Sequence, residues 1–175
     1  EIVRSLVGSE MCIRDRELAG SLQQSRCKTS SMMNNLTRKA TIADAIEVGK
    51  NIRPEDKMEI EGLGHGLGAL PFSVALSDVA VTFTDTDGTI AGVAGITPGQ
   101  IEGHGIIWMI CTPVVTRKPI TFVREAKKWI AEQEKNYSVL CNYTDIRNKF
   151  HHKLVKMLGF KAIRIVQPAP LYLPY

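Results

Sequence analysis

The sequence NKFHHKLVKMLGF, residues Asn148 to Phe160, indicates the architecture of the chain most clearly. Its apolar side chains recur at four-residue spacing and predict a helix with one apolar stripe, formed by Phe150, Leu154 and Leu158. Asn148 suits the start of this helix, because an Asn side chain at that place accepts a backbone N–H of the first turn. Gly159 suits its end. The sequence therefore predicts a helix from Asn148 to Leu158.

Further elements follow from the sequence on both sides of this helix. Strands are predicted at Tyr137–Tyr143 and Lys161–Val166. Apolar residues at three- and four-residue spacing predict a long amphipathic helix over Pro119–Asn136. Before it, the unbroken apolar run GIIWMICT, Gly105–Thr112, is typical of a central strand that is buried on both faces. A strand, a helix and a strand in this order predict a parallel crossover.

The first half of the chain predicts antiparallel strands. Val79–Thr84 and Thr89–Ile96 alternate in the manner of strands, and the turn-forming residues Asp85–Gly88 join them into a hairpin. The preceding run GLGHGLG, Gly62–Gly68, is rich in glycine. Since a helix precedes it and a predicted strand follows it, it lacks the context of a phosphate-binding loop and is predicted to be a connector.

The first predicted elements are a short strand at Thr37–Thr41 and a helix over Ile42–Asn51, with Thr41 as its cap and Asp44 three residues on. A second, short helix is predicted at Asp56–Ile60. The complete order is β-α-α-β-β-β-α-β-α-β. It predicts an α/β fold in which helices flank the faces of a mixed central sheet.

Length and composition narrow the classes of protein. The chain has 175 residues, 44% of them hydrophobic, and a formal net charge of +4, which suits one globular domain without a basic run for nucleic acid. No apolar run reaches membrane-spanning length. The spacing of the four cysteines predicts neither a metal site nor a disulfide framework. We therefore expect a soluble protein of a reducing compartment that is not secreted.

The ends of the chain are treated separately from the domain. The string EIVRSLVGSEMCIRDR, Glu1–Arg16, closely resembles a translated sequencing-adapter read-through, so residues 1–33 are interpreted as a leader outside the fold. Residues 34–167 are predicted to form the single domain. Residues 168–175 form a proline-rich tail, interpreted as an extended arm or a truncated end.

The order of elements and the sequence Asn148–Phe160 resemble the Gcn5-related N-acetyltransferase (GNAT) fold. In that fold an Asn opens the last major helix and a Gly-Phe pair closes it, at spacings that this chain keeps. More specifically, RKATIADAIEVGKNIRPEDKMEI from Arg38, GIIWMICT, and LCNYTDIRNKFHHKLVKMLGF from Leu140 are similar to the acetyltransferase-like internal virion protein A family of short-tailed bacteriophages. The similarity runs from Arg38 to Phe160.

This resemblance implies that acetyl-CoA binds where two parallel strands splay, with its pyrophosphate at a helix N-terminus. The positions that it assigns to the cofactor are Cys111, Thr112, Thr116, Arg117, Lys118, Thr121 and Asn148. Active members usually carry glycines at the phosphate loop, whereas Pro119 here removes an N–H donor. Two interpretations stay open: Arg117 and Lys118 bind phosphate by charge, or they are solvated loop residues.

The resemblance also implies a Tyr four residues before Gly159, which would protonate the departing thiolate. Val155 stands there instead, and Tyr143 is the candidate substitute, or else a wall of the cleft. For a general base the candidates are His104 and Glu102. Two further histidines, His151 and His152, are interpreted either as surface residues or as contacts to the region of the missing Tyr.

Two functions therefore stay open at this point. The first is a phage protein that kept the fold, has a degenerate acetyl-CoA site and serves in virion assembly or inside the particle, with other virion proteins as partners. The second is an active N-acetyltransferase that moves an acetyl group from acetyl-CoA to an amine acceptor. Either would act in the host cytoplasm or in the virion interior. Fold alone does not choose between them.

Overall fold

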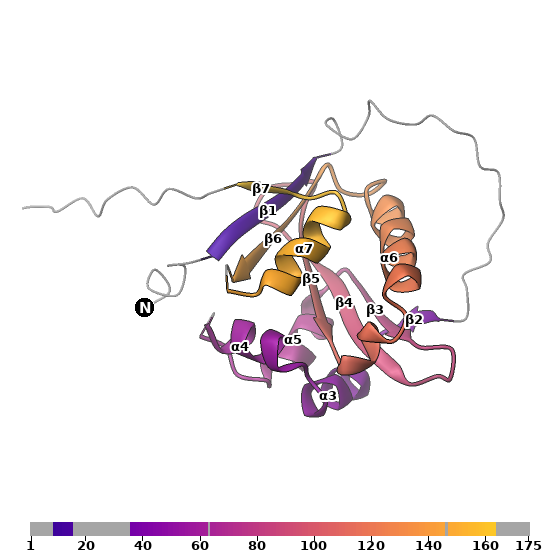
Figure 1. The fold of residues 1–175 in the computed structure, drawn as a ribbon. Helices are drawn as coiled ribbons and strands as arrows, with labels where there is room; N and C mark the ends of the chain where they lie inside the picture. Colours follow the sequence, from indigo (N-terminus) through magenta and orange to yellow (C-terminus); the bar gives the residue numbers. More distant parts are fainter. Residues whose placement is uncertain (1–8, 16–35, 63, 146, 164–175) are drawn as a thin grey trace, which may run out of the picture.

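The computed structural model describes residues 9–15, 36–62, 64–145 and 147–163 (Figure 1). These residues form one mixed sheet in the order β2-β3-β4-β5-β6-β1-β7. Its strands are β1 (Ser9–Asp15), β2 (Thr37–Lys39), β3 (Val79–Thr84), β4 (Ile90–Pro98), β5 (His104–Cys111), β6 (Val139–Asp145) and β7 (Lys161–Ile163). The pairing of β5 with β6 is parallel, and the other pairings are antiparallel.

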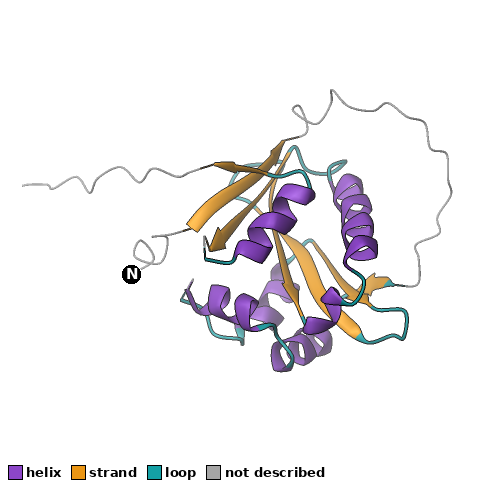
Figure 2. Cartoon of the chain, viewed as in Figure 1, coloured by secondary structure: helices purple, strands orange, loops and turns teal. Residues whose placement is uncertain are grey.

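Helices cover both faces of the sheet (Figure 2). They are α3 (Ile42–Lys50), α4 (Pro54–Gly62), α5 (Ala69–Leu76), the short 3-10 helix η1 (Pro113–Thr116), α6 (Pro119–Gln133) and α7 (Lys149–Met157). In Figure 1, α6 and α7 lie together and α3, α4 and α5 form a separate group. We call the two sides of the sheet the α6–α7 face and the α3–α5 face. The predicted α/β fold class is confirmed.

Alternation along β5 supplies both cores. Ile107 packs with Ile130 of α6 and Leu154 of α7 on the α6–α7 face. The next residue, Trp108, packs on the α3–α5 face with Val48 of α3. Because successive side chains of a strand point to opposite faces, the unbroken apolar run gives a strand with a core on each side.

The parallel pair β5 and β6 is joined only at its beginning. His104, Gly105 and Ile106 pair with Val139, Leu140 and Cys141, and no later residue of β5 pairs with β6. Beyond these residues, β5 continues beside β4 and β6 continues beside β1. The two strands therefore splay apart toward their carboxyl ends.

The cap predicted at the start of α3 is present in the structure. The Thr41 hydroxyl accepts the backbone N–H of Asp44, and the Asp44 carboxylate accepts the N–H of Thr41, which is a complete capping box. Near the C-terminal end of the described chain, the Asn148 side chain accepts the N–H of His151 at the start of α7, as expected.

Helix α5 was missed by the sequence analysis, which placed a strand after the glycine-rich run. ALPFSVAL, Ala69–Leu76, has no helical alternation of polar and apolar residues. Pro71 lies in its first turn, where a proline leaves no helical hydrogen bond unmade. Leu70 and Val74, four residues apart, are the side chains that it buries. The burial of these two side chains in the tertiary structure therefore stabilises this segment as a helix.

The exclusion of the leader from the fold was wrong for Ser9–Asp15, which the structure places as β1 between β6 and β7. The side chain of Cys12 is 1% exposed and lies in the core of the α6–α7 face. Arg14 bonds to Glu134 after α6 and to the carbonyl of Leu158. Long-range pairing of this kind leaves no local signal in the sequence. Whether the leader derives from an adapter stays a prediction.

The C-terminal end of the chain is described only as far as Ile163. The last strand, predicted to reach Val166, is described from Lys161 to Ile163, and the tail at 168–175 lies outside the described residues. Across the described ranges, no helix is both long and apolar enough to cross a membrane.

Candidate functional site

Two cavities meet where β5 and β6 separate. The α6 cavity lies on the α6–α7 face and has an empty volume of about 700 Å³, part of it open to solvent. The α5 cavity lies on the α3–α5 face and has a corresponding volume of about 640 Å³. Both cavities are lined by Trp108, Met109, Asn142 and His151. The two cavities therefore share a wall at the place where the strands separate.

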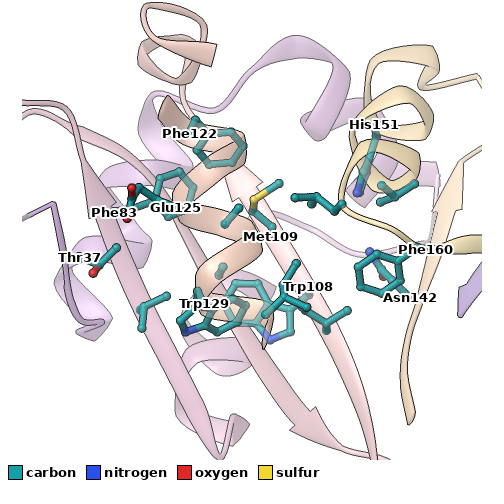
Figure 3. A pocket seen from close by; sticks show the side chains of 17 residues that line it. Thr37, Phe83, Trp108, Met109, Phe122, Glu125, Trp129, Asn142, His151 and Phe160 are labelled. Atoms are coloured by element: carbon teal, nitrogen blue, oxygen red, sulfur yellow. The ribbon is translucent and has the colours of Figure 1, made fainter. Parts of the chain in front are cut away.

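The α6 cavity is mainly apolar and aromatic (Figure 3). Phe83, Phe122 and Trp129 line it at the side of α6, and Phe160 lines it at the side of α7. The polar side chains at its wall are Thr37, Glu125, Asn142 and His151. A wall of this composition suits the apolar part of a ligand, with polar groups at a few fixed positions.

The Trp108 ring, which is part of the wall that the two cavities share, fits only because residue 95 on the neighbouring strand is a glycine. A Cβ atom on Gly95 of β4 would lie 2.7 Å from the ring of Trp108. Trp108 also donates its indole N–H to the hydroxyl of Ser77 at 3.0 Å. The indole is therefore held in one orientation at the meeting point of the cavities.

Two carboxylates of α4 bind the separated ends of β5 and β6. The Asp56 carboxylate accepts the N–H of Cys111, the last residue of β5, at 3.0 Å. The Glu59 carboxylate accepts the N–H of Asp145, the last residue of β6, at 3.1 Å. Residues three apart on a helix share a face, so α4 stabilises both strand ends in their separated positions. In doing so it provides acceptors for two backbone N–H groups at the strand ends.

Glu59 is also paired with a histidine from the other face of the site. Its Oε2 atom lies 2.9 Å from Nδ1 of His151, and the same oxygen accepts the side-chain N–H of Asn148 at 2.8 Å. Glu59 and His151 are 6% and 9% exposed. Burial by itself raises the pKa of Glu59. The bonds from His151, Asp145 and Asn148 outweigh burial, so the pKa lies below its ordinary value and the carboxylate is ionised.

Asp56 differs from Glu59 in its electrostatics. Burial raises the pKa of its carboxyl group, and the charge of Arg53 and the N–H of Cys111 only partly offset this effect. The Arg53 guanidinium lies over the ring of Phe150, 4.2 Å from its centre. Arg53, Asp56, Cys111 and His151 line one small cavity next to the two larger ones. Burial and the charge of Asp56 also raise the pKa of the Cys111 thiol, which excludes a thiolate there.

The predicted phosphate-binding cations are already paired. Nη1 of Arg117 lies 3.2 Å from Asp87 and 3.6 Å from Asp85, and the Lys118 ammonium lies 3.0 Å from Asp85. Both carboxylates belong to the turn between β3 and β4. Both cations are about half exposed. A phosphate group at this place would therefore compete with the two carboxylates.

The predicted hydroxyl donors near this loop bond to the chain itself. The Thr112 hydroxyl donates to the carbonyl of Ile90 at 2.9 Å, and the Thr116 hydroxyl donates to the carbonyl of Pro113 at 2.8 Å. Thr121 lines a smaller cavity together with Lys118 and Asp85. The cofactor positions thus divide into two places, with Cys111 and Asn148 at the splayed strands and Arg117, Lys118 and Thr121 at the start of α6.

The two predicted catalytic residues are not brought together. Tyr143 is half-buried and lines the α5 cavity. His104 pairs with Val139, where β5 and β6 are still joined, and it lines neither the α6 nor the α5 cavity. Their roles stay predictions.

Sequence reasoning missed the pair of Glu59 and His151, and left His151 open between a surface position and the region of the missing Tyr. The structure buries it, one helical turn before Val155. One signal was available: Asp56 and Glu59 are three residues apart on a helix and are followed by Ile60 on a buried face. Within the described ranges, no group of three or more His, Cys, Asp or Glu side chains is placed to hold a metal ion.

Neither the models of known protein families nor the curated protein sequences match the chain. Several solved structures are similar to the chain. An acetyltransferase of the GNAT family from Novosphingobium aromaticivorans is 16% identical, with a TM-score of 0.57, and the match covers 89% of this chain and 60% of that one. A spermidine N-acetyltransferase SpeG chimera from Vibrio cholerae and hSSAT is 12% identical, with a TM-score of 0.50, covering 71% and 79%.

A third match is more distant. The PaiA N-acetyltransferase from Thermoplasma acidophilum, solved in complex with coenzyme A, is 18% identical with a TM-score of 0.38, covering 55% of this chain and 72% of that one. The first two matches, with TM-scores of 0.57 and 0.50, show a likeness of fold over most of this chain. The chain therefore has the fold of the GNAT acetyltransferases.

Proposed function

We propose that the chain is an N-acetyltransferase that moves an acetyl group from acetyl-CoA to a primary amine. The observation that carries the proposal is the separation of β5 and β6, where a cavity on each face of the sheet is lined by the same four residues. A donor on one face and an acceptor on the other would meet there. Proximity of this kind is the main requirement of a group transfer between two bound molecules.

The α6 cavity suits the donor. Its apolar wall fits the acyl end of a thioester, and the unpaired edges of the splayed strands offer backbone groups to the amides of a pantetheine arm. The phosphate end fits less well, because Asp85 and Asp87 already pair with Arg117 and Lys118. The α5 cavity, with Tyr143 and His65 among its lining residues, is then the place for the amine.

Calorimetric titration of acetyl-CoA tests the donor site. We expect micromolar binding to the full chain, weaker binding to the Arg117→Ala, Lys118→Ala variant and tighter binding, by about threefold, to an Asp85→Asn, Asp87→Asn variant. A Lys50→Ala, Lys135→Ala variant removes the same charge from exposed positions and is the matched control. Mass spectrometry of acetylated amines, with spermidine in the panel, tests transfer. Absence of binding at millimolar acetyl-CoA contradicts the proposal.

A scaffold role inside a phage particle is the second candidate. It is favoured by Val155 in the place of the expected Tyr and by the carboxylates that neutralise Arg117 and Lys118. Its partners would be virion proteins, and its location the host cytoplasm or virion interior. A folded chain that binds no acetyl-CoA and is recovered with purified particles would support this role over the enzyme.

A further inference from the structure

The geometry points to His151 as the acid–base group of the transfer, with Glu59 as the residue that positions it. This inference rests on the proposed function. It assigns the proton transfer to α7 by a side chain other than the Tyr that the family resemblance implied at the position of Val155.

Position is the first argument. Among the described side chains that line both the α6 cavity and the α5 cavity, His151 is the one that can titrate. A group that takes a proton from an amine in one cavity and returns it to a thiolate in the other must reach both. Figure 3 shows His151 at the α7 side of the α6 cavity. Tyr143 and Glu125, by comparison, each line one of the two cavities.

Orientation is the second argument. Nδ1 of His151 lies against the Glu59 carboxylate, which can only accept, so Nδ1 is the donor of this bond and, in the neutral imidazole, the lone pair is on Nε2. No described residue makes a hydrogen bond to Nε2. Glu59 is itself fixed, because its two oxygens also accept the N–H groups of Asp145 and Asn148. The imidazole is thus held in one orientation by Glu59, and its Nε2 atom makes no hydrogen bond within the described residues.

The charges around the imidazole come from several elements. Glu59 and Asp56 face it from α4, and Arg53, which precedes α4, lines the same small cavity as His151. Across the two large cavities lie His65, Glu125 and Tyr143. Glu59 and Asp56 already accept strand N–H groups, so neither carboxylate is free to act as the base.

The proposed step balances without another reactant. The nitrogen of the neutral amine attacks the carbonyl carbon of the thioester, the C–N bond forms, and the C–S bond breaks with its electron pair on sulfur. One N–H proton passes to Nε2 of His151 and then to the thiolate. The products are the N-acetylated amine and free CoA, and the imidazole ends in its starting state.

The test uses the full chain with acetyl-CoA and butylamine, and follows release of the CoA thiol. The variant is His151→Asn, because the Asn side-chain N–H replaces Nδ1 as donor to Glu59 while Nε2 is lost. His152→Asn, on the next residue of α7, is the matched control. We expect His151→Asn to bind acetyl-CoA as the full chain does, to lose about 100-fold or more in kcat, and to lose the acidic limb of the pH profile. His152→Asn should retain both.

Other outcomes overturn the inference in distinguishable ways. If His151→Asn binds acetyl-CoA and turns over within about threefold of the full chain, with the same pH profile, the acid–base role is wrong while the proposed function stands. If the unsubstituted chain binds no acetyl-CoA, the proposed function fails, and the inference fails with it.

A second measurement does not depend on whether the His151→Asn variant folds. Nitrogen NMR of the unsubstituted chain should show His151 protonated at Nδ1, and a proton fixed at Nε2 would overturn the inference. A Glu59→Gln variant should also shift the acidic limb of the pH profile to lower pH, because the carboxylate favours the protonated imidazole. An unchanged profile in that variant would show that Glu59 does not position the base.

Discussion

Asp44 joins α3 to two strands of the sheet. Its carboxylate accepts two hydrogen bonds from Arg38 of β2, at 2.6 and 2.7 Å, and one from the hydroxyl of Thr82 in β3 at 2.9 Å. It also accepts the backbone N–H of Thr41. These bonds, the one from Arg38 above all, hold its pKa well below the ordinary value. A single side chain therefore links the start of α3 to the edge of the sheet.

We expect Asp44→Asn to lower the free energy of unfolding by roughly 1–2 kcal/mol at pH 7, because a charged acceptor is lost at a helix cap. The folded pKa is depressed, so the contribution is complete above the unfolded value of about 4 and is lost as pH falls below it. Urea unfolding at several values between pH 2.5 and pH 7 measures the difference. A difference that stays constant down to pH 2.5 would contradict the electrostatic origin.

At the scale of elements, the position of β1 has the largest consequence. It pairs along its whole length with β6 and over three residues with β7. Without it, β6 would become an edge strand, β7 would lose the strand with which it pairs, and the core of the α6–α7 face would lose the Cys12 side chain. The sequence, by contrast, gave reason to leave this segment outside the fold.

Removal of residues 1–33 tests whether β1 is part of the fold or whether the leader lies outside it. We expect the shortened chain to unfold with a free energy lower by roughly 3 kcal/mol or more, because an interior strand and its core contact are lost. Thermal unfolding of the full and shortened chains measures this loss. Cys12→Asp in the full chain should destabilise it as well, by burying a charge. Equal midpoints for all three chains would mean that the leader contributes nothing to the fold.

At the scale of the molecule, the proposed function links ligand binding to stability. A ligand that bridges β5, β6, α6 and α7 binds only the folded chain, so it raises the free energy of unfolding by mass action. The separated strands, the two cavities and the pair of Glu59 and His151 all depend on α4 being packed against both strand ends.

Acetyl-CoA at a concentration 100 times its dissociation constant should therefore stabilise the chain by about 2.7 kcal/mol, or roughly 5–10 °C in Tm. Differential scanning fluorimetry measures this shift, with free acetate as a control that should give none. A shift of the same size with acetate, or none with acetyl-CoA, would contradict binding at the proposed site.

The sequence alone determined those features whose causes lie within a few residues. The capping box at Thr41 and Asp44, the hairpin at Val79–Ile96 and the Asn148 cap depend on neighbours in the chain, and all three formed as predicted. The positions of α6 and β5 followed from periodicity and hydrophobicity for the same reason, although α6 ends at Gln133 rather than Asn136 and β5 begins and ends one residue earlier than predicted.

Only the tertiary structure decided the site and two of the elements. Glu59 and His151 are 92 residues apart, so no local pattern could pair them. Helix α5 has no amphipathic period, and β1 pairs with strands more than a hundred residues away, as the Cys12 and Thr144 contact shows. Arg117 and Lys118 were placed correctly in a loop, but the carboxylates that neutralise them come from another turn. Interactions between distant segments depend on how the whole chain packs, and a single sequence read locally does not contain that information.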